Sequence, residues 1–187
     1  MTTGEGGMFV TSNDSLYQKV IDLSNHGCSS SQKKQFSPGK IGFKYKLSNV
    51  QAAIGCAQLE RIENLINVKR KIFKYYYERL KHLPLIMNPE SEGTSNGYWL
   101  PNIIIDPDVE FDRRVLLKMF ANDNIDARIF FRPLSTLSIF EERPNNVVSH
   151  SIHKRGINLP SYHDMKESEM DRVIKNILLC LGHTNNS

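Results

Sequence analysis

The sequence is poor in cysteine and has no long apolar run. Its three cysteines, Cys28, Cys56 and Cys180, are odd in number and form no Cys-x-x-Cys pair, which argues against a zinc site or a disulfide framework. No apolar stretch approaches the roughly 20 residues that a bilayer-spanning helix needs. The opening residues also lack the basic start and apolar stretch of a signal peptide. We therefore expect a cytoplasmic protein with no membrane partner.

The chain also lacks a large excess of charge of one sign. The chain has 24 basic and 20 acidic residues, which are interspersed and leave a net charge of +4. Proteins that bind nucleic acid usually concentrate basic residues on one face. The short basic clusters of this chain fit the solvated surface of helices or loops more simply, so no nucleic-acid partner is expected.

The histidines do not indicate a metal centre. The six of them are scattered, and His150 and His153 are the pair at helical spacing. No carboxylate is placed to act as a third ligand. We expect no metal site.

The first part of the chain predicts a strand followed by a helix. Residues 8–11, Met-Phe-Val-Thr, have the pattern of a short buried strand. Asn13 or Asp14 is placed to cap the helix that follows. That helix is expected to end near Gly27, with the glycine at its C-terminal cap. A polar, serine-rich loop is expected over residues 28–40.

The most regular stretch runs from Ser48 to Leu80. Ser48 precedes Gln51 by three residues, which is the capping-box arrangement at the start of a helix. The apolar spacing continues to Leu80 and ends before Pro84. The pattern predicts one long helix, or two helices joined by a kink near residues 64–67. Its apolar face needs a large partner surface, either within the chain or on another subunit.

Short strands alternate with helices after Pro84. Strands are predicted at 98–105, 127–131 and 157–159, and helices after Asp112 and over 145–155. A last helix carries an apolar stripe and is followed by Gly182; the stripe consists of Met170, Val173, Ile174, Ile177, Leu178 and Leu181.

The chain is thus predicted to be α/β and to have three parts. Residues 1–47 form a strand-and-helix segment, residues 48–83 a long helical connector or interface, and residues 84–187 a small C-terminal α/β domain.

Two segments are candidates for binding an anion. Backbone amides of glycines can approach a phosphate closely, but the glycines of residues 4–7 precede the expected strand, and a tight turn is the simpler interpretation. Lys44 and Lys46 flank Tyr45, so alternation places both ammonium groups on one side of an extended segment, where they could hold an anion. The spacing alone fits solvated lysines equally well.

Five blocks of sequence carry a family resemblance. They are TTGEGGMFVT at 2–11, GFKYKLSNVQAAIG at 42–55, AQLE at 57–60, RIFFRPLS at 128–135 and GINLPS at 156–161. In order and spacing these blocks resemble the DegT/DnrJ/EryC1/StrS family of nucleotide-sugar aminotransferases, which depend on pyridoxal 5'-phosphate (PLP). The resemblance implies the aspartate-aminotransferase fold (fold type I), with residues 1–47 as the end of its large PLP-binding domain and the C-terminal part as its small domain.

The resemblance also bears on catalysis. In the family, the lysine that forms the Schiff base with PLP lies a few residues before the Thr-Thr-Gly-Glu-Gly-Gly turn, which places it upstream of Met1. No catalytic residue is therefore assigned within the chain. Because the cofactor then lacks both its anchor and its acid/base group, the polypeptide by itself is not expected to transaminate.

Binding residues are carried over from the family by position. Lys44 and Lys46, where the family more often has asparagine and arginine, are expected to contact the PLP phosphate in the partner subunit of a homodimer. The segment that borders the sugar-nucleotide pocket is matched by Arg128, Phe130, Phe131 and Ser135, and one of the two phenylalanines is expected to be core.

The implied activity is transfer of an amino group from an amino acid, with glutamate as the expected donor, to a nucleotide-linked keto sugar. Two alternatives stay open, namely a non-catalytic remnant and a binding or regulatory module that pairs with a full-length paralogue.

Overall fold

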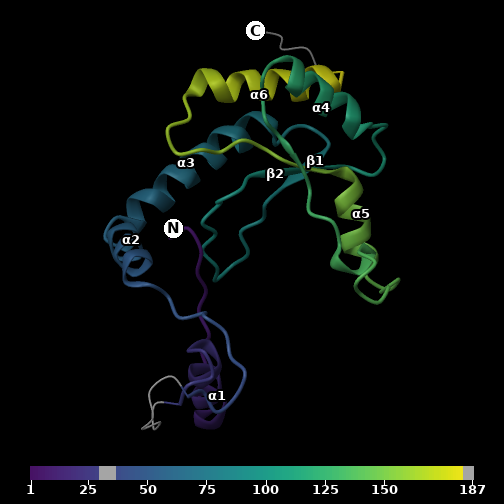
Figure 1. Ribbon diagram of the computed structural model, residues 1–187. Coiled ribbons are helices and arrows are strands. Elements are labelled where there is room, and N and C mark those ends of the chain that lie inside the picture. The colour runs from purple at the N-terminus through teal and green to yellow at the C-terminus, as the bar shows by residue number, and fades with distance from the viewer. Residues whose placement is uncertain (30–36, 183–187) are drawn as a thin grey trace. The chain divides into compact units, whose positions relative to one another are not determined.

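The computed structural model describes residues 1–29 and 37–182 (Figure 1). The chain divides into two compact units, Met1–Ile62 and Glu63–Ser187.

Two capped helices organise the first unit. Helix α1 spans Asp14–Ser24, and the Asn13 side chain accepts a hydrogen bond from the Leu16 N–H (3.0 Å). Helix α2 spans Asn49–Leu59 and begins with the predicted capping box, in which the side chains of Ser48 and Gln51 each accept from the other residue's backbone N–H. Both helix starts are confirmed.

The chain turns sharply after α1 and returns alongside its end. The Phe43 N–H donates to the Leu23 carbonyl (2.6 Å) and the Tyr45 N–H to the Ser24 carbonyl (3.0 Å). Gly27 has a φ of 73°, and a Cβ there would lie 1.9 Å from the Lys40 carbonyl oxygen. A glycine is therefore required, because both the backbone conformation and the close approach exclude a side chain.

The prediction of a strand at residues 8–11 is wrong. No strand forms there, and the side chains of Met8 and Val10 are 88% and 83% exposed. A strand needs a neighbour to satisfy its backbone groups, and within the described residues of the first unit no strand is present to provide one.

The long helical stretch is two helices, but the break differs from the prediction. Helix α3 spans Ile62–Leu80, so the interruption falls at Glu60 and Arg61 rather than at residues 64–67. Near it, the Arg61 N–H donates to the Gln58 carbonyl (3.3 Å), a tighter turn than that of an α-helix.

The second unit contains a four-stranded antiparallel sheet in the order β1-β2-β4-β3. The strands are β1 Leu85–Met87, β2 Asn102–Ile105, β3 Arg128–Ile129 and β4 Gly156–Asn158. The three strands predicted after Pro84 are present, although each is shorter or shifted, whereas β1 was not anticipated.

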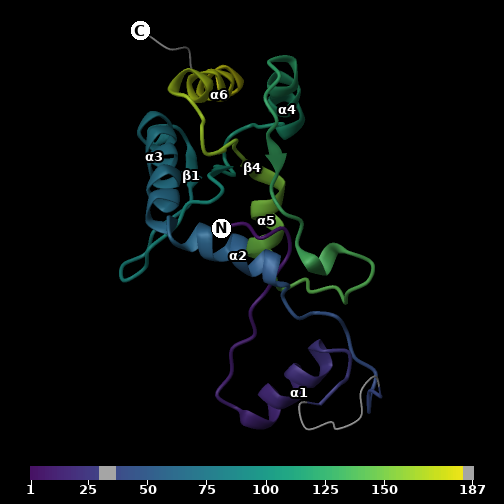
Figure 2. The same ribbon diagram turned by 60° about the vertical axis from the view of Figure 1, so that its left-hand side comes forward.

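Four α-helices pack around this sheet. Besides α3 they are α4 Arg113–Asn122, α5 Val147–Arg155 and α6 Glu167–Cys180, with a short 3-10 helix η1 at Leu134–Thr136. In Figures 1 and 2, α4 and α6 lie on one side of the strands and α5 on the other. Asp112 caps α4, as predicted, by accepting from the Arg114 N–H (2.8 Å).

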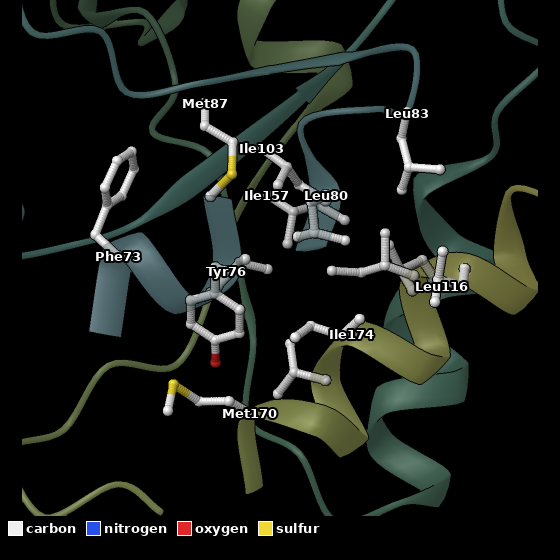
Figure 3. Close-up of a cluster of buried hydrophobic side chains, with 14 of the residues drawn as sticks. Phe73, Tyr76, Leu80, Leu83, Met87, Ile103, Leu116, Ile157, Met170 and Ile174 are labelled. Carbon is white, nitrogen blue, oxygen red and sulfur yellow. The ribbon is translucent and has the colours of Figure 1, made fainter. Parts of the chain in front are cut away.

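The hydrophobic core lies between the sheet, α3, α4 and α6 (Figure 3). Five of the six residues of the predicted α6 stripe are buried, and the sixth, Leu181, is partly buried. Tyr76 is fully buried, and its Oη donates to the Pro160 carbonyl (3.0 Å). Burial raises the pKa of its hydroxyl. The largest fully buried hydrophobic side chains are Tyr76, Phe120, Leu80, Ile103, Ile105, Leu116, Ile157, Leu159, Ile177 and Val173.

Candidate functional site

The two anion-binding candidates of the sequence meet at one hollow of the first unit. The hollow has a volume of about 920 Å³ and is lined by Glu5, Gly6 and Gly7, by one side of α1, and by residues 43–47. The glycine segment is a bend, as expected, and the Glu5 carbonyl accepts from the Gln51 side chain (3.0 Å) at the start of α2. That bond fixes the segment to the capping box.

Lys44 and Lys46 both line this hollow and are exposed. The backbone of Lys44 forms a β-bridge with Asn25, and the neighbouring rings of Phe43 and Tyr45 stack with centroids 5.2 Å apart. Neither ammonium group has an ion pair or a hydrogen bond within the described residues. Two unpaired ammonium groups that line a hollow fit a phosphate group. Lysine binds phosphate as a point charge and does not need the planar, two-pronged geometry of arginine.

The four residues matched to the sugar-nucleotide pocket lie in the second unit, around β3 and η1. Arg128 is exposed and pairs with Asp126 at 2.8 Å. Phe131 is 63% exposed, whereas Phe130 is half-buried, and the two rings meet edge to face with centroids 6.3 Å apart. Phe130 is thus the less exposed of the two rings, but neither ring belongs to the hydrophobic core.

Phe130 is held against β4. Its N–H donates to the Gly156 carbonyl (3.2 Å), and a Cβ on Gly156 would lie 2.7 Å from the Phe130 Cβ. Phe130 and Phe131 also line a hollow of about 640 Å³ with Pro133 and residues of α5. The segment therefore has one face fixed to the sheet and another open to solvent.

Two histidines of α5 hold this segment in place, a role that the sequence did not predict. His150 Nε2 lies 3.3 Å from the hydroxyl of the buried Ser135. His153 Nδ1 lies 3.0 Å from the Phe130 carbonyl oxygen, and because a carbonyl only accepts, this nitrogen carries the proton. Their three-residue spacing was the available signal, but it says that the side chains share a helix face and not what they contact.

Ser135 is less accessible than a ligand-binding role implies. Ser135 is only 9% exposed, and its hydroxyl is already hydrogen-bonded to the His150 ring. It also borders a separate hollow of about 490 Å³ with Phe140, Arg143 and Asn146. No group of histidine, cysteine or acidic side chains that could hold a metal ion is found in residues 1–29 and 37–182.

Solved structures show the fold of this chain. A sugar aminotransferase from Streptococcus pneumoniae, solved in PMP and PLP forms, matches with TM-scores of 0.78 and 0.77 at 16% and 17% identity, over 92% of this chain and 44–45% of that chain. The aminotransferase TlmJ of Streptoalloteichus hindustanus matches with a TM-score of 0.78 at 18% identity, over 91% of this chain and 46% of that chain. The fold is that of the C-terminal part of a fold type I aminotransferase.

The sequence itself assigns the family. Residues 1–178 match the DegT/DnrJ/EryC1/StrS aminotransferase family, and the chain belongs to it. The GDP-perosamine synthase of Vibrio cholerae is 36% identical over 187 residues, which are 97% of this chain and 50% of the relative. The GDP-perosamine synthase of Escherichia coli O157:H7 is 30% identical over 95% of this chain and 48% of the relative. The chain spans about half the length of the curated relatives it matches.

In the described part of the chain, no helix combines the length and the apolar character that crossing a membrane requires.

Proposed function

We propose that this chain forms the C-terminal half of a PLP-dependent aminotransferase that acts on a nucleotide-linked keto sugar. The observation that carries the proposal is the pair of uncompensated lysines, Lys44 and Lys46, at the hollow beside the glycine bend, in a chain of this family. Their role is to hold the PLP phosphate in the active site of a partner subunit, which makes the active enzyme a homodimer.

PLP, when bound, supplies an electron sink that lets an amino group pass between an amino acid and a keto sugar. The lysines of this chain contribute charge and position. Each ammonium group neutralises part of the phosphate as a point charge, and its flexible stem accommodates small shifts of the anion. The β-bridge of Lys44 with Asn25 fixes the backbone from which one of these side chains reaches.

The segment around β3 is proposed to bind the sugar nucleotide. Arg128 presents a guanidinium fork suited to a diphosphate, and its exposed pair with Asp126 costs little to exchange for one. The exposed ring of Phe131 offers a stacking surface. Phe130 and Ser135 are held by His153 and His150 and so set the shape of the segment.

The names of the relatives support a substrate class. Three of the similar proteins are GDP-perosamine synthases, so we propose a GDP-linked keto sugar as acceptor. The proposed donor is glutamate, as the family resemblance implies.

The 187-residue polypeptide alone is proposed to be inactive, because the Schiff-base lysine of the family precedes the part matched here. A pairing module is the second candidate. It is supported by the exposed apolar side chains of the first unit, such as Val10, Ile41 and Val50, which a second polypeptide would cover.

The test is complementation. The chain is incubated with PLP, glutamate and a GDP-linked keto sugar, with and without a separately produced upstream half of a family member that carries the lysine. We expect 2-oxoglutarate only when both halves are present. In the mixture of both halves, the K44M/K46M substitutions should weaken PLP binding, which fluorescence quenching measures. The matched control K118M/K175M should leave PLP binding unchanged. Substantial 2-oxoglutarate formation by the chain alone would contradict the proposed inactivity, and unchanged PLP binding by K44M/K46M would contradict the phosphate role.

A further inference from the structure

We propose that the second unit binds an acidic peptide in an extended conformation, in a groove between α3 and the open edge of β1. The groove has a volume of about 890 Å³. One wall is a face of α3 and the other is the six consecutive residues from Leu85 to Glu90. None of these residues lies in the two segments proposed to bind PLP and the sugar nucleotide.

The lining pattern shows that the groove follows a strand edge. Successive side chains of a strand point to opposite faces of the sheet. All three residues of β1 line the groove, which is possible only where the groove runs along the edge of the strand. Strand β1 is the outermost strand of the sheet, with β2 as its neighbour on the other side.

The hydrogen-bond alternation of β1 leaves backbone groups directed to this edge. The Asp106 N–H donates to the Pro84 carbonyl (2.9 Å), so these two residues form a hydrogen-bonded pair. With Ile86 opposite Ile104, the alternation of an antiparallel ladder directs the backbone of Ile86 to β2 and that of Leu85 and Met87 away from it.

These outward groups are suited to receive another strand. The Leu85 N–H already donates to the Leu83 carbonyl (2.7 Å). The Met87 N–H and the carbonyls of Leu85 and Met87 face a side on which no strand pairs in the described part of the chain. Such an edge binds an extended peptide through main-chain hydrogen bonds, and pockets or charges beside it select the side chains.

The charge beside the edge is positive. Arg70 is neutralised by Glu90 (2.6 and 2.9 Å), and Lys81 pairs with Glu78. Lys71 and Lys74 line the groove without an ion pair or hydrogen bond of their own within the described residues. These two lysines select a peptide with acidic side chains toward α3.

The aromatic residues of the groove favour a peptide over a nucleotide. Phe73 and Tyr98 stack face to face with centroids 3.7 Å apart, and each is only 7% exposed. Phe73 and Met87 lie at one margin of the core in Figure 3. These two rings already cover one another, and the third ring of the groove, Tyr77, is 43% exposed but has the Lys81 ammonium group 5.9 Å from its centroid. A nucleotide base therefore has little free aromatic face to stack on.

The position of the side chains defines the peptide. An added strand alternates between the side of α3, where Lys71 and Lys74 lie, and the side of Ile86, which is 63% exposed. A peptide that alternates glutamate with threonine places carboxylates near the lysines and methyl groups near the isoleucine. It is the probe for the experiment.

Binding of the fluorescently labelled peptide to the full chain is measured by anisotropy. We expect saturable binding that the K71E/K74E variant weakens about tenfold, because two attractions become repulsions. The matched control K118E/K175E changes exposed lysines of α4 and α6 and should bind as the unchanged protein does.

A second measurement tests the strand pairing itself. The amide of Met87 should shift in the NMR spectrum and exchange more slowly when the peptide is bound, and a peptide N-methylated at alternate residues should not bind. The proposal is overturned if a lysine–threonine peptide binds equally well, or if Met87 is unaffected. It is also overturned if a free nucleotide displaces the peptide from the groove, which would mark a nucleotide site. Self-association of the chain that protects Met87 without peptide would instead mark the edge as a contact between copies.

Discussion

The two units of the chain contain similar helices but bury very different side chains. In the second unit Tyr76, Ile103 and Ile157 are completely inaccessible to solvent. Among the described residues of the first unit no hydrophobic side chain is buried, and the buried side chain is that of Asp22. Helices therefore form in both units from caps and local spacing, whereas a hydrophobic core forms in one.

Polar contacts take the place of a core in the first unit. Asp22 is bonded to Lys40 (2.9 Å) and to Gln18 (2.9 Å), and the segment after Lys40 returns to the end of α1 through backbone hydrogen bonds. Contacts of this kind contribute less than the burial of large apolar side chains. The second unit is thus expected to carry most of the stability of the chain.

The largest test of this difference compares two leucines that end helices. Leu80 ends α3 and is fully buried, and Leu59 ends α2 and is 61% exposed. L80A should lower the free energy of unfolding by about 2–5 kcal/mol, and L59A by less than about 0.5 kcal/mol. Urea unfolding followed by circular dichroism measures both. Equal losses would show that the first unit has a core of its own.

A second comparison uses two glycines. A Cβ on Gly156 meets Phe130 at 2.7 Å, whereas a Cβ on Gly7 has nothing within 4 Å. G156A should destabilise the protein by about 1–3 kcal/mol through overpacking, while G7A should leave the unfolding midpoint nearly unchanged. A tolerated G156A would mean that Phe130 is free to move away from β4.

The third comparison concerns tyrosine ionisation. Burial raises the pKa of Tyr76, so the native state keeps this proton above about pH 10, where an unfolded tyrosine loses it. Its contribution to stability is present below that pH and is lost as pH rises further. Y76F should cost about 1 kcal/mol at neutral pH through its lost hydrogen bond, and should lose less stability than the unchanged protein does above pH 10.

The control for this experiment is Y17F, because Tyr17 is 54% exposed in the first unit. Its alkaline stability profile should match that of the unchanged protein. If Y76F loses as much stability above pH 10 as the unchanged protein does, the burial of the Tyr76 hydroxyl is contradicted.

The smallest expected effect is in acid. Hydrogen bonds from Arg70 and the Asn96 backbone lower the pKa of Glu90 to about 2, and bonds from Lys40 and Gln18 lower the pKa of Asp22 below 3.8. Both carboxylates therefore add stability above their ordinary pKa values that is lost as pH falls through the lowered ones. Carbon-detected NMR titration of each carboxyl group measures this directly.

Removing the cations supplies the matched variants. R70M should return the Glu90 pKa toward 4.5 without changing Asp22, and K40M should raise the Asp22 pKa without changing Glu90. An ordinary pKa for Asp22 in the unchanged protein would show that the polar contacts of the first unit do not persist in solution.

Helix starts could be predicted from the sequence because capping is local. Asn13, Ser48 and Asp112 each bond to a backbone N–H two or three residues ahead, so the signal and the structure lie in the same short segment. The stripe of α6 was predictable for a similar reason, since its period matches the helix. The break at Glu60 and Arg61 involves neither proline nor glycine, and no local signal marks it.

Strands were predicted less well because they depend on distant partners. Residues 8–11 have an apolar run, but no neighbouring strand satisfies its backbone in the described residues. Strand β1 has only three residues and follows a proline, and it exists because β2 pairs with it. In the candidate site, Lys44 and Lys46 were indicated by their alternation around Tyr45 and by the family pattern. The contacts of His150 and His153 arise from tertiary packing that no spacing encodes.

The backbone of Tyr98 has a consequence for sequence variation. Its φ of 44° lies in the left-handed region, which costs a non-glycine residue about 1–3 kcal/mol. The ring offsets this strain by stacking on Phe73 and lying beneath the Arg70 guanidinium, 5.3 Å from the ring centroid. Homologous proteins should therefore accept two unlike residues at this position: an aromatic ring that keeps the stack, or a glycine that has no strain to offset. Alanine would keep the backbone strain and lose the stacking that offsets it.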